Sequence, residues 1–334
     1  MVARKALLAV SVFCSAASLS AQEPPGPGGR AVATSQPART VAEDLGFGPV
    51  ERLLIIHGDD AGMCHSANVG TIEALSRGVV NSSSIMTPCP WLLEIAAYCR
   101  EHPDADFGVH IALTSEWKHY RWGPVAPHPE VSGLLDTDAY LWPGVAEVVL
   151  HATADEVERE IRAQVKRALA VGIRPTHIDT HMGTVFGRPD FFQAYRKVAN
   201  EFKLPYLLPR LREEVLATRD PLTRMTALAL KNQMSGSREF TLDDLISIEG
   251  HVPVEKQKQF YIDAIRKLKP GITQIIIHCG VEGEELKAIT GTNARRDMDR
   301  QVFCDPEVKA VLAAERIRLI TWREIGERQR RRRD

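Results

Sequence analysis

The stretch Arg52-Leu53-Leu54-Ile55-Ile56-His57-Gly58-Asp59-Asp60-Ala61-Gly62 decides the fold, because an apolar run within it ends at two adjacent acids. Four consecutive apolar residues, followed closely by glycine, predict a buried parallel strand rather than a helix. Asp59 and Asp60 then lie at its carboxyl end, where α/β proteins bind ligands in both open sheets and barrels. Adjacent side chains of an extended chain point in different directions, so one carboxylate could hold a metal ion while the other faces a substrate. The alternative is a solvated Asp-Asp-x-Gly turn.

The composition predicts a globular chain with no electrostatic preference for nucleic acid. The 334 residues include 42 Lys plus Arg and 43 Asp plus Glu, for a formal net charge of −1. Such a balance gives no field that would gather nucleic acid or an anionic membrane. The closing arginines are few, terminal and free of interleaved aromatics, so residues 326–334 are interpreted as a solvated basic tail.

The first residues have the layout of an export signal. Arg4 and Lys5 precede a short apolar run and then small residues, which predicts a signal peptide over residues 1–21. The run is too short to predict an integral membrane domain, and an uncleaved anchor is the alternative. Residues 22–42 are rich in proline and glycine and predict a flexible leader. A single folded domain is therefore expected over residues 43–325 of a secreted or periplasmic protein.

Five cysteines remain after the leader, and they favour free thiols. They are Cys64, Cys89, Cys99, Cys279 and Cys304. An odd number without CxxC spacing argues against a zinc knuckle and against a disulfide-dense scaffold. Buried free thiols are the default, and a single bridge formed after export is the alternative.

The hydrophobic pattern alternates between strand and helix. Apolar residues recur at helical spacing from Val69 until Gly78, and a capping box that begins at Thr153 opens the most regular helical pattern in the chain. Further strands are expected at residues 79–86, 106–113, 174–181, 205–209, 271–280 and 317–321, and further helices at 91–99, 191–202 and 254–268. About seven parallel strands alternating with helices over this length predict one α/β domain with a barrel-like sheet.

Histidines recur at the ends of the predicted strands. His110 lies among apolar residues of the third strand, where an ordinary hydrogen-bonded core histidine is the alternative to a ligand. His177, Asp179 and His181 follow one another at period two, so in a strand they share one face and favour a ligand or catalytic role. His278 ends a later strand of β-branched residues. These residues and the two acids are expected to meet at one edge of the sheet.

Residues 115–143 form a long irregular stretch, which is typical of a functional loop. They include five aromatic residues: Trp117, Tyr120, Trp122, Tyr140 and Trp142. Exposed aromatic faces beside a cleft would suit sugar rings, and ordinary loop packing is the alternative.

The strand-end residues provide a usual set of catalytic metal ligands. One carboxylate with two imidazoles leaves coordination positions open for water and substrate. A second carboxylate nearby can serve as general base, and a further histidine as general acid. Mixed nitrogen and oxygen ligands suit Zn²⁺, and the carboxylate also admits Mg²⁺ or Mn²⁺.

Four motifs follow one another in the chain, between residues 57 and 181. They are His57-Gly58-Asp59-Asp60-Ala61-Gly62, Asn81-Ser82-Ser83-Ser84, Gly108-Val109-His110-Ile111-Ala112-Leu113-Thr114 and Pro175-Thr176-His177-Ile178-Asp179-Thr180-His181. In this order they resemble the motifs of the YdjC-like (ChbG/HpnK) carbohydrate deacetylases. The resemblance implies a distorted TIM-like (β/α) barrel of the polysaccharide-deacetylase type. It also implies removal of acetyl groups from N-acetylated sugars with a divalent metal ion, Mg²⁺ or Zn²⁺.

The resemblance also assigns roles to individual residues. Asp59 matches the catalytic base of the family, and Asp60, His110 and His181 match its metal ligands. His278 is a weaker match and is assigned as the acid. Among the remaining residues, Asp179 is expected to orient a ligand histidine, and His177 is an alternative ligand or a structural partner.

The chain also departs from the family pattern. The first family motif usually reads Asn-Ala-Asp-Asp-Phe-Gly, whereas this chain has His57, Gly58 and Ala61. Met182-Gly183-Thr184-Val185 follow His181 where the family usually has further histidines. These changes leave the metal set intact and leave the sugar and its chain length open.

Two other functions remain as alternatives. The same metal centre could hydrolyse an ester or a phosphoester. A secreted carbohydrate-binding protein could have kept the barrel and lost activity. The oligomeric state is open as well, with a homodimer as one alternative.

Overall fold

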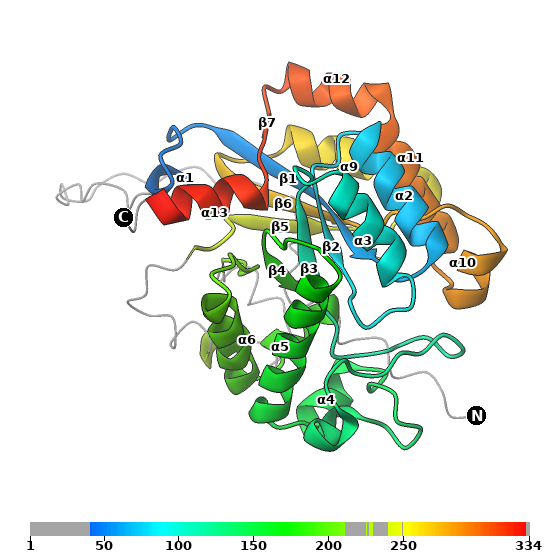
Figure 1. Ribbon diagram of the computed structural model, residues 1–334. Helices are drawn as coiled ribbons and strands as arrows, with labels where there is room; N and C mark the ends of the chain where they lie inside the picture. Colours follow the sequence, from blue (N-terminus) through cyan, green and yellow to red (C-terminus); the bar gives the residue numbers. More distant parts are fainter. Residues whose placement is uncertain (1–40, 211–224, 226, 230–239, 249, 332–334) are drawn as a thin grey trace, which may run out of the picture.

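The computed structural model describes residues 41–210, 225, 227–229, 240–248 and 250–331 (Figure 1). The predicted signal peptide and the leader up to residue 40 lie outside these ranges. Within them, no helix combines the length and the apolar character needed to cross a membrane.

Seven parallel strands form one curled sheet at the centre of the molecule (Figure 1). They are β1 (Arg52–Ala61), β2 (Ser82–Ile85), β3 (Phe107–Ile111), β4 (Ile178–Thr180), β5 (Asp244–Ser247), β6 (Gly271–Ile277) and β7 (Arg318–Leu319). The strand order is β4-β3-β2-β1-β6-β5, and β7 pairs with Leu53 and Leu54 of β1. The apolar run of β1 is almost fully buried, as its sequence predicted.

An irregular segment bridges the gap between the two ends of this sheet. Tyr206 pairs with Ile178 of β4, and Pro209 pairs with Leu242 just before β5. A regular strand was expected at residues 205–209, but the two prolines in this segment lack the N–H groups that a continuous ladder requires. The predicted distorted TIM-like (β/α) barrel is therefore confirmed, and this segment is part of its distortion.

Helices cover the outside of the barrel, with α2, α3, α9 and α11 in the upper part of Figure 1 and α5 and α6 in the lower part. They are α1 (Val41–Asp44), α2 (His65–Ser76), α3 (Leu92–Glu101), α4 (Val145–His151), α5 (Ala154–Ala170), α6 (Pro189–Glu201), α9 (Gln257–Arg266), α10 (Glu284–Ile289), α11 (Asn293–Cys304), α12 (Pro306–Ala314) and α13 (Trp322–Arg331). Short 3₁₀ turns lie at η1 (His128–Glu130), η2 (Ser132–Leu134), η3 (His181–Phe186) and η4 (Val254–Lys256). The capping box predicted at Thr153 is present, since its hydroxyl accepts from Glu156 N and the Glu156 carboxylate accepts from Thr153 N.

The folded domain extends beyond both of its predicted boundaries. α1 begins at Val41 and buries Ala42, two residues that were assigned to the leader. Residues 326–331 were assigned to a solvated tail, but they continue α13 to its end at Arg331. Arg328 lies with its guanidinium 4.0 Å from the centre of the Phe47 ring. Arg328 thus packs on the domain, because an arginine can pack its stem and guanidinium against an apolar or aromatic surface, whereas Glu327, Arg330 and Arg331 are exposed.

The five cysteines of the described chain are all free thiols, as the default expectation had it. Cys64, Cys89 and Cys279 are buried and contribute to the apolar core. Burial raises the pKa of the Cys64 thiol to about 12, which keeps it protonated and unreactive at neutral pH.

Gly108 of β3 lies directly against a ring of the barrel interior, so we expect Gly108→Ala to destabilise the fold. An added Cβ would lie 2.5 Å from His177 Nε2. That ring has little room to move, because it stacks on Trp322 with centroids 5.0 Å apart. Overpacking of this kind costs about 1–3 kcal/mol, and thermal denaturation should show a melting temperature several degrees lower. Gly291→Ala, at a position with nothing within 4 Å, is the control. Equal melting temperatures of the two variants would contradict this packing.

Candidate active site

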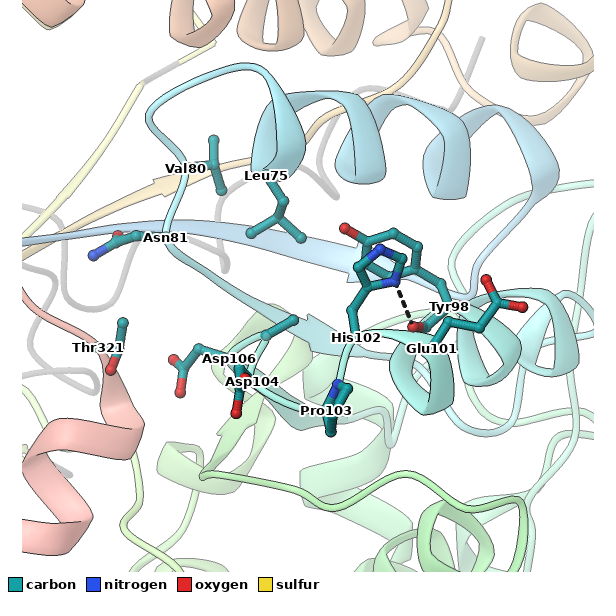
Figure 2. A pocket seen from close by; sticks show the side chains of 11 residues that line it. Leu75, Val80, Asn81, Tyr98, Glu101, His102, Pro103, Asp104, Asp106 and Thr321 are labelled. Carbon is teal, nitrogen blue, oxygen red and sulfur yellow. Dashed lines mark hydrogen bonds between the residues drawn. The ribbon is translucent and has the colours of Figure 1, made fainter.

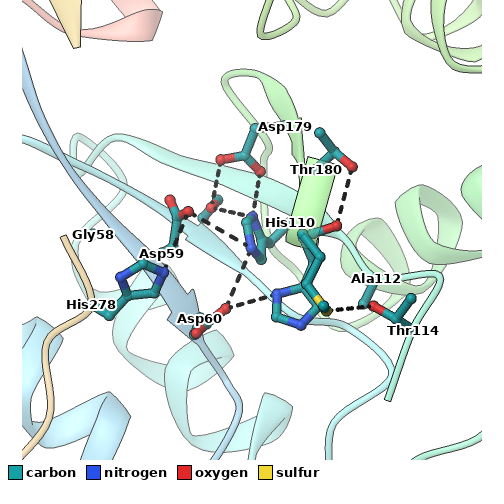
Figure 3. Close-up of polar contacts among 12 residues, drawn as sticks. Gly58, Asp59, Asp60, His110, Ala112, Thr114, Asp179, Thr180 and His278 are labelled. Atoms are coloured by element: carbon teal, nitrogen blue, oxygen red, sulfur yellow. Dashed lines mark hydrogen bonds and ion pairs between the residues drawn. The ribbon is translucent and has the colours of Figure 1, made fainter. Parts of the chain in front are cut away.

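A bulge at the end of β1 turns both acids toward one site (Figure 3). Between Gly58 and Ala61 the pairing of β1 with β2 slips, and Asp60 has a left-handed backbone with φ of 66°. Asp60 Oδ1 lies 3.3 Å from His110 Nε2, and Asp59 Oδ2 lies 3.9 Å from the same nitrogen. Because a bulge interrupts the alternation of a regular strand, both carboxylates lie within reach of the same imidazole.

Asp60, His110 and His181 are brought together at the carboxyl ends of β1, β3 and β4. Asp60 Oδ1 is 3.3 Å from His110 Nε2 and 3.3 Å from His181 Nδ1, and one atom of each residue lies within 4.8 Å of the others. Asp60 Oδ1 is buried and has no hydrogen-bond partner among the described residues. A buried oxygen without a donor is costly, and a cation held between it and the two imidazoles would compensate that cost. The donor set therefore fits a divalent metal ion.

A carboxylate contacts the second nitrogen of each of these imidazoles. Asp179 Oδ1 lies 2.8 Å from His110 Nδ1, and Glu116 Oε2 lies 3.0 Å from His181 Nε2. Burial alone would lower the pKa of His181, but Glu116 and Asp60 raise it to about 9. Carboxylate partners of this kind fix the ring orientation of metal-binding histidines and make the ligand nitrogen more basic.

We expect Glu116→Gln to weaken metal binding by about 10-fold or more, because the amide removes the charge behind His181 while keeping the shape of the side chain. Calorimetric titration of Zn²⁺ into metal-free protein would measure the dissociation constant. Glu130→Gln is the matched control, since Glu130 is exposed in the same loop. Equal affinities in both variants and the wild type would show that Glu116 does not support the site.

Asp59 lies between two histidines, the buried His57 and the partly exposed His278. Its Oδ1 is 3.3 Å from His57 Nε2, and its Oδ2 is 4.0 Å from His278 Nε2. Burial raises the pKa of Asp59 to about 7, and the charges of Asp179 and Asp60 act in the same direction. A carboxylate that titrates near neutral pH is suited to general base chemistry. The His278 side chain is 35% exposed, so it lies on the open side of the group.

Asp179 and His57, which are both buried, extend the hydrogen-bond network of the site further into the protein. Asp179 Oδ2 lies 2.9 Å from His57 Nε2, and His57 Nδ1 lies 2.9 Å from Ser82 Oγ. Burial would raise the pKa of Asp179, but the imidazoles of His110 and His57 hold it well below its usual range. Asp179 thus has the contacts that its expected role of orienting His110 requires.

His177 lies in the inner layer, against His57 and Trp322. Its ring centroid is 5.1 Å from that of His57, and burial lowers its pKa well below the ordinary value. His57, His177 and Asp179 also offer three ligand atoms within 4.8 Å of one another. The oxygens of Asp179 are already hydrogen-bonded there, to His57, Ser84 and His110. These contacts favour His177 as a structural partner.

The sequence did not single out three residues of the site. His57 stood out only as a departure from the family motif, although its spacing of two from Asp59 places both on one face of a strand. Glu116 lies in an irregular loop, where no periodicity marks it. Arg296 lies in α11 and donates from Nη2 to Asp60 Oδ2 over 2.7 Å, and nothing in the sequence connects two residues so far apart.

The aromatic residues of the loop mainly pack against one another and the site. Trp122 is buried, with ring centroids 5.4 Å from Trp117 and 6.3 Å from His181. Tyr140 is 41% exposed. Loop packing therefore accounts for Trp122, whereas the Tyr140 ring is accessible to solvent.

A separate pocket lies at the amino ends of the central strands (Figure 2). Its lining includes Leu75, Val80, Asn81, Tyr98, His102 and Asp106. None of the acids and histidines predicted for the site lines this pocket. The candidate chemistry is thus confined to the opposite, carboxyl ends of the strands.

Sequence comparison finds a matching family model and similar proteins of known name. Residues 53–314 match the family model described as YdjC-like protein. A carbohydrate deacetylase of Thermus thermophilus is 31% identical over 285 residues, which cover 85% of this chain and 97% of the relative. A chitooligosaccharide deacetylase of Yersinia enterocolitica is 31% identical over 162 residues, which cover 48% of this chain and 61% of the relative.

A solved structure from Enterococcus faecalis has the same fold. It is described as a candidate cellobiose-phosphate cleavage protein and superposes with a TM-score of 0.67 at 24% sequence identity. The alignment covers 82% of this chain and 99% of the other. The barrel is therefore shared over nearly the whole of that protein.

Proposed function

Because this chain belongs to the YdjC-like family, we propose that it removes acetyl groups from N-acetylated sugars or oligosaccharides with one divalent metal ion, Mg²⁺ or Zn²⁺. One observation carries the proposal: the buried Oδ1 of Asp60 lies 3.3 Å from a nitrogen of each of two imidazoles, and a carboxylate contacts each imidazole from behind. The names of the relatives in Thermus and Yersinia support the substrate class.

Each side chain near the metal position has a role in this proposal. Asp60, His110 and His181 would hold the ion, while Asp179 and Glu116 keep the two imidazoles oriented. When bound, the ion would polarise the acetyl carbonyl and lower the pKa of a water molecule. The water oxygen adds to the acetyl carbon, the carbon–nitrogen bond breaks, and acetate and a free amine leave the site.

Asp59 and His278 would move the protons in this reaction. Asp59 removes a proton from the attacking water, a role that suits a buried carboxylate with its pKa raised to about 7. Burial lowers the pKa of His278, so its imidazole is neutral and Asp59 keeps the proton taken from water. The imidazole accepts this proton from Asp59, 4.0 Å from its Nε2, only as its other ring nitrogen gives up a proton, so the ring stays neutral. His278 then protonates the departing amine, for which its more exposed position beside the base is suited.

Acetate release tests the proposed reaction. Purified protein loaded with Zn²⁺ or Mg²⁺ should release acetate from N-acetylglucosamine oligomers, with one new amine for each acetate. Aryl acetates and phosphate esters should be turned over far more slowly. Faster turnover of an ester or phosphate ester would favour a different hydrolase, and binding of oligomers without acetate release would favour a carbohydrate-binding protein.

We also propose that the chain is exported, on the basis of its first 21 residues. Expression of the full chain in a bacterial host, followed by N-terminal sequencing of the periplasmic fraction, should give a mature protein that begins near residue 22. Recovery of the intact chain from the cytoplasm alone would contradict this proposal.

A further inference from the structure

We propose that Arg296 is a positioning residue that fixes Asp60 as a metal ligand with a single oxygen. The inference rests on the proposed function, since it requires a metal ion held by Asp60, His110 and His181. Arg296 lies in α11, 236 residues after Asp60, and reaches the site from the outer layer of helices.

The ion pair with Arg296 occupies one oxygen of the Asp60 carboxylate and leaves the other facing the metal position. Arg296 Nη2 donates to Asp60 Oδ2 over 2.7 Å, and the two side chains are only 8% and 1% exposed. Oδ2 is therefore occupied, while Oδ1 faces His110 Nε2 and His181 Nδ1 at 3.3 Å each. A charge-assisted bond of this kind is short and strongly directional, so it sets which oxygen faces the metal position.

The backbone of Asp60 makes such a restraint necessary. Its φ of 66° lies in the left-handed region, which residues other than glycine occupy only when surrounding contacts hold them there. The neighbouring pairing of β1 with β2 is irregular between Gly58 and Ala61, so the regular strand ladder does not fix this residue. Met63 N donates to Asp60 O over 3.2 Å, and the contact with Arg296 adds the restraint on the side chain.

Arg296 is itself held in place by several contacts. Its Nε donates to Thr292 Oγ1 over 3.3 Å, and its backbone carbonyl accepts from Gly280 N over 3.1 Å. Its guanidinium carbon lies 5.8 Å from the centre of the Trp117 ring. A side chain anchored on this many sides can act as a rigid support for Asp60.

Metal affinity of Arg296→Met distinguishes positioning from a simple charge effect. Removal of a positive charge beside a cation should by itself tighten metal binding. Loss of positioning should weaken it, by about 10- to 100-fold in the Zn²⁺ dissociation constant measured by calorimetry on metal-free protein. Unchanged or tighter binding by Arg296→Met would overturn the inference.

Two further variants separate positioning from folding. Arg300→Met removes an ion pair of the same helix, from Arg300 Nη1 to Glu73 Oε2 at 2.8 Å, and should leave the Zn²⁺ dissociation constant unchanged. Equal weakening in Arg300→Met and Arg296→Met would assign the effect to the helix and overturn the inference. If Arg296→Met does not fold, Arg296→Lys decides instead, because it keeps the charge and loses the guanidinium geometry. Weakening of about 10-fold is then expected, and wild-type affinity would overturn the inference.

The wild-type titration separates this inference from the proposed function. A wild-type protein that binds no divalent metal would overturn both. Metal binding by the wild type with undiminished binding by the Arg296 variants would overturn the inference alone.

Discussion

Replacement of Asp59 by Asn should lower kcat/KM for acetate release by about 10³-fold, because the amide cannot accept the proton of the attacking water. The shape of the side chain is preserved, and Asp60, His110 and His181 are untouched. The Zn²⁺ dissociation constant should therefore change far less than the rate. The measurement is acetate release from an N-acetylglucosamine oligomer, compared with calorimetric metal binding on the same preparation.

The stability of Asp59→Asn excludes unfolding as the cause of a lost rate. The pKa of Asp59 is raised to about 7 in the folded protein, above its value in the unfolded chain. The protonated carboxyl therefore stabilises the fold at a pH below the unfolded-state pKa, and this stabilisation is lost as the pH rises toward 7. At pH 8 the metal-free variant should then melt no lower than the metal-free wild type. Asp104→Asn, an exposed aspartate near the opposite end of the barrel, is the matched control and should keep full activity. Turnover by Asp59→Asn within a few-fold of the wild type would remove Asp59 from the mechanism.

Replacement of His181 by Gln should abolish metal retention and acetate release together. His181 Nδ1 lies 3.3 Å from Asp60 Oδ1, and no other imidazole among the described residues is positioned to replace it in the set of Asp60 and His110. Loss of a residue that only supports a ligand costs about 10- to 100-fold in affinity, so loss of the ligand itself should cost more than about 100-fold. Elemental analysis after dialysis should find close to no metal in the variant.

His65→Gln is the matched control for this ligand variant. His65 is half exposed on α2 and pairs with Glu94, and it belongs to none of the groups of described residues that could hold a metal ion. This variant should retain as much metal as the wild type. Equal metal content in His65→Gln and His181→Gln would show that the ion, if bound, lies elsewhere.

The sequence alone predicts the parts of the molecule whose structure is set by a local residue pattern. The buried run of β1 and the capping box at Thr153 each lie where their pattern placed them, and Asp60, His110 and His181 lie close together. Carboxyl ends of parallel strands meet at one edge of a sheet, so the order of strands and helices along the chain was enough to group Asp60, His110 and His181.

The remaining features depend on contacts that no local pattern encodes. β5 and helices α10 to α12 had no predicted counterpart. β5 has four residues and α10 has six, and elements this short are set by packing against their neighbours. The bulge that turns Asp59 and Asp60 to one site requires a left-handed Asp60, and the sequence alone does not reveal that conformation. Glu116 and Arg296 reach the site through a loop and a distant helix, so only the folded chain connects them with His181 and Asp60.

Metal-dependent acetate release is the central claim, and a titration of metal into the chelated protein tests it most directly. Protein stripped of metal should release no acetate from N-acetylglucosamine oligomers. Addition of Zn²⁺ or Mg²⁺ should restore the rate in proportion to the metal bound, up to about one ion per chain, as expected for a single site of three protein ligands. Acetate release that is unaffected by stripping, or absent with Zn²⁺, Mg²⁺ and Mn²⁺ at full occupancy, would contradict the account.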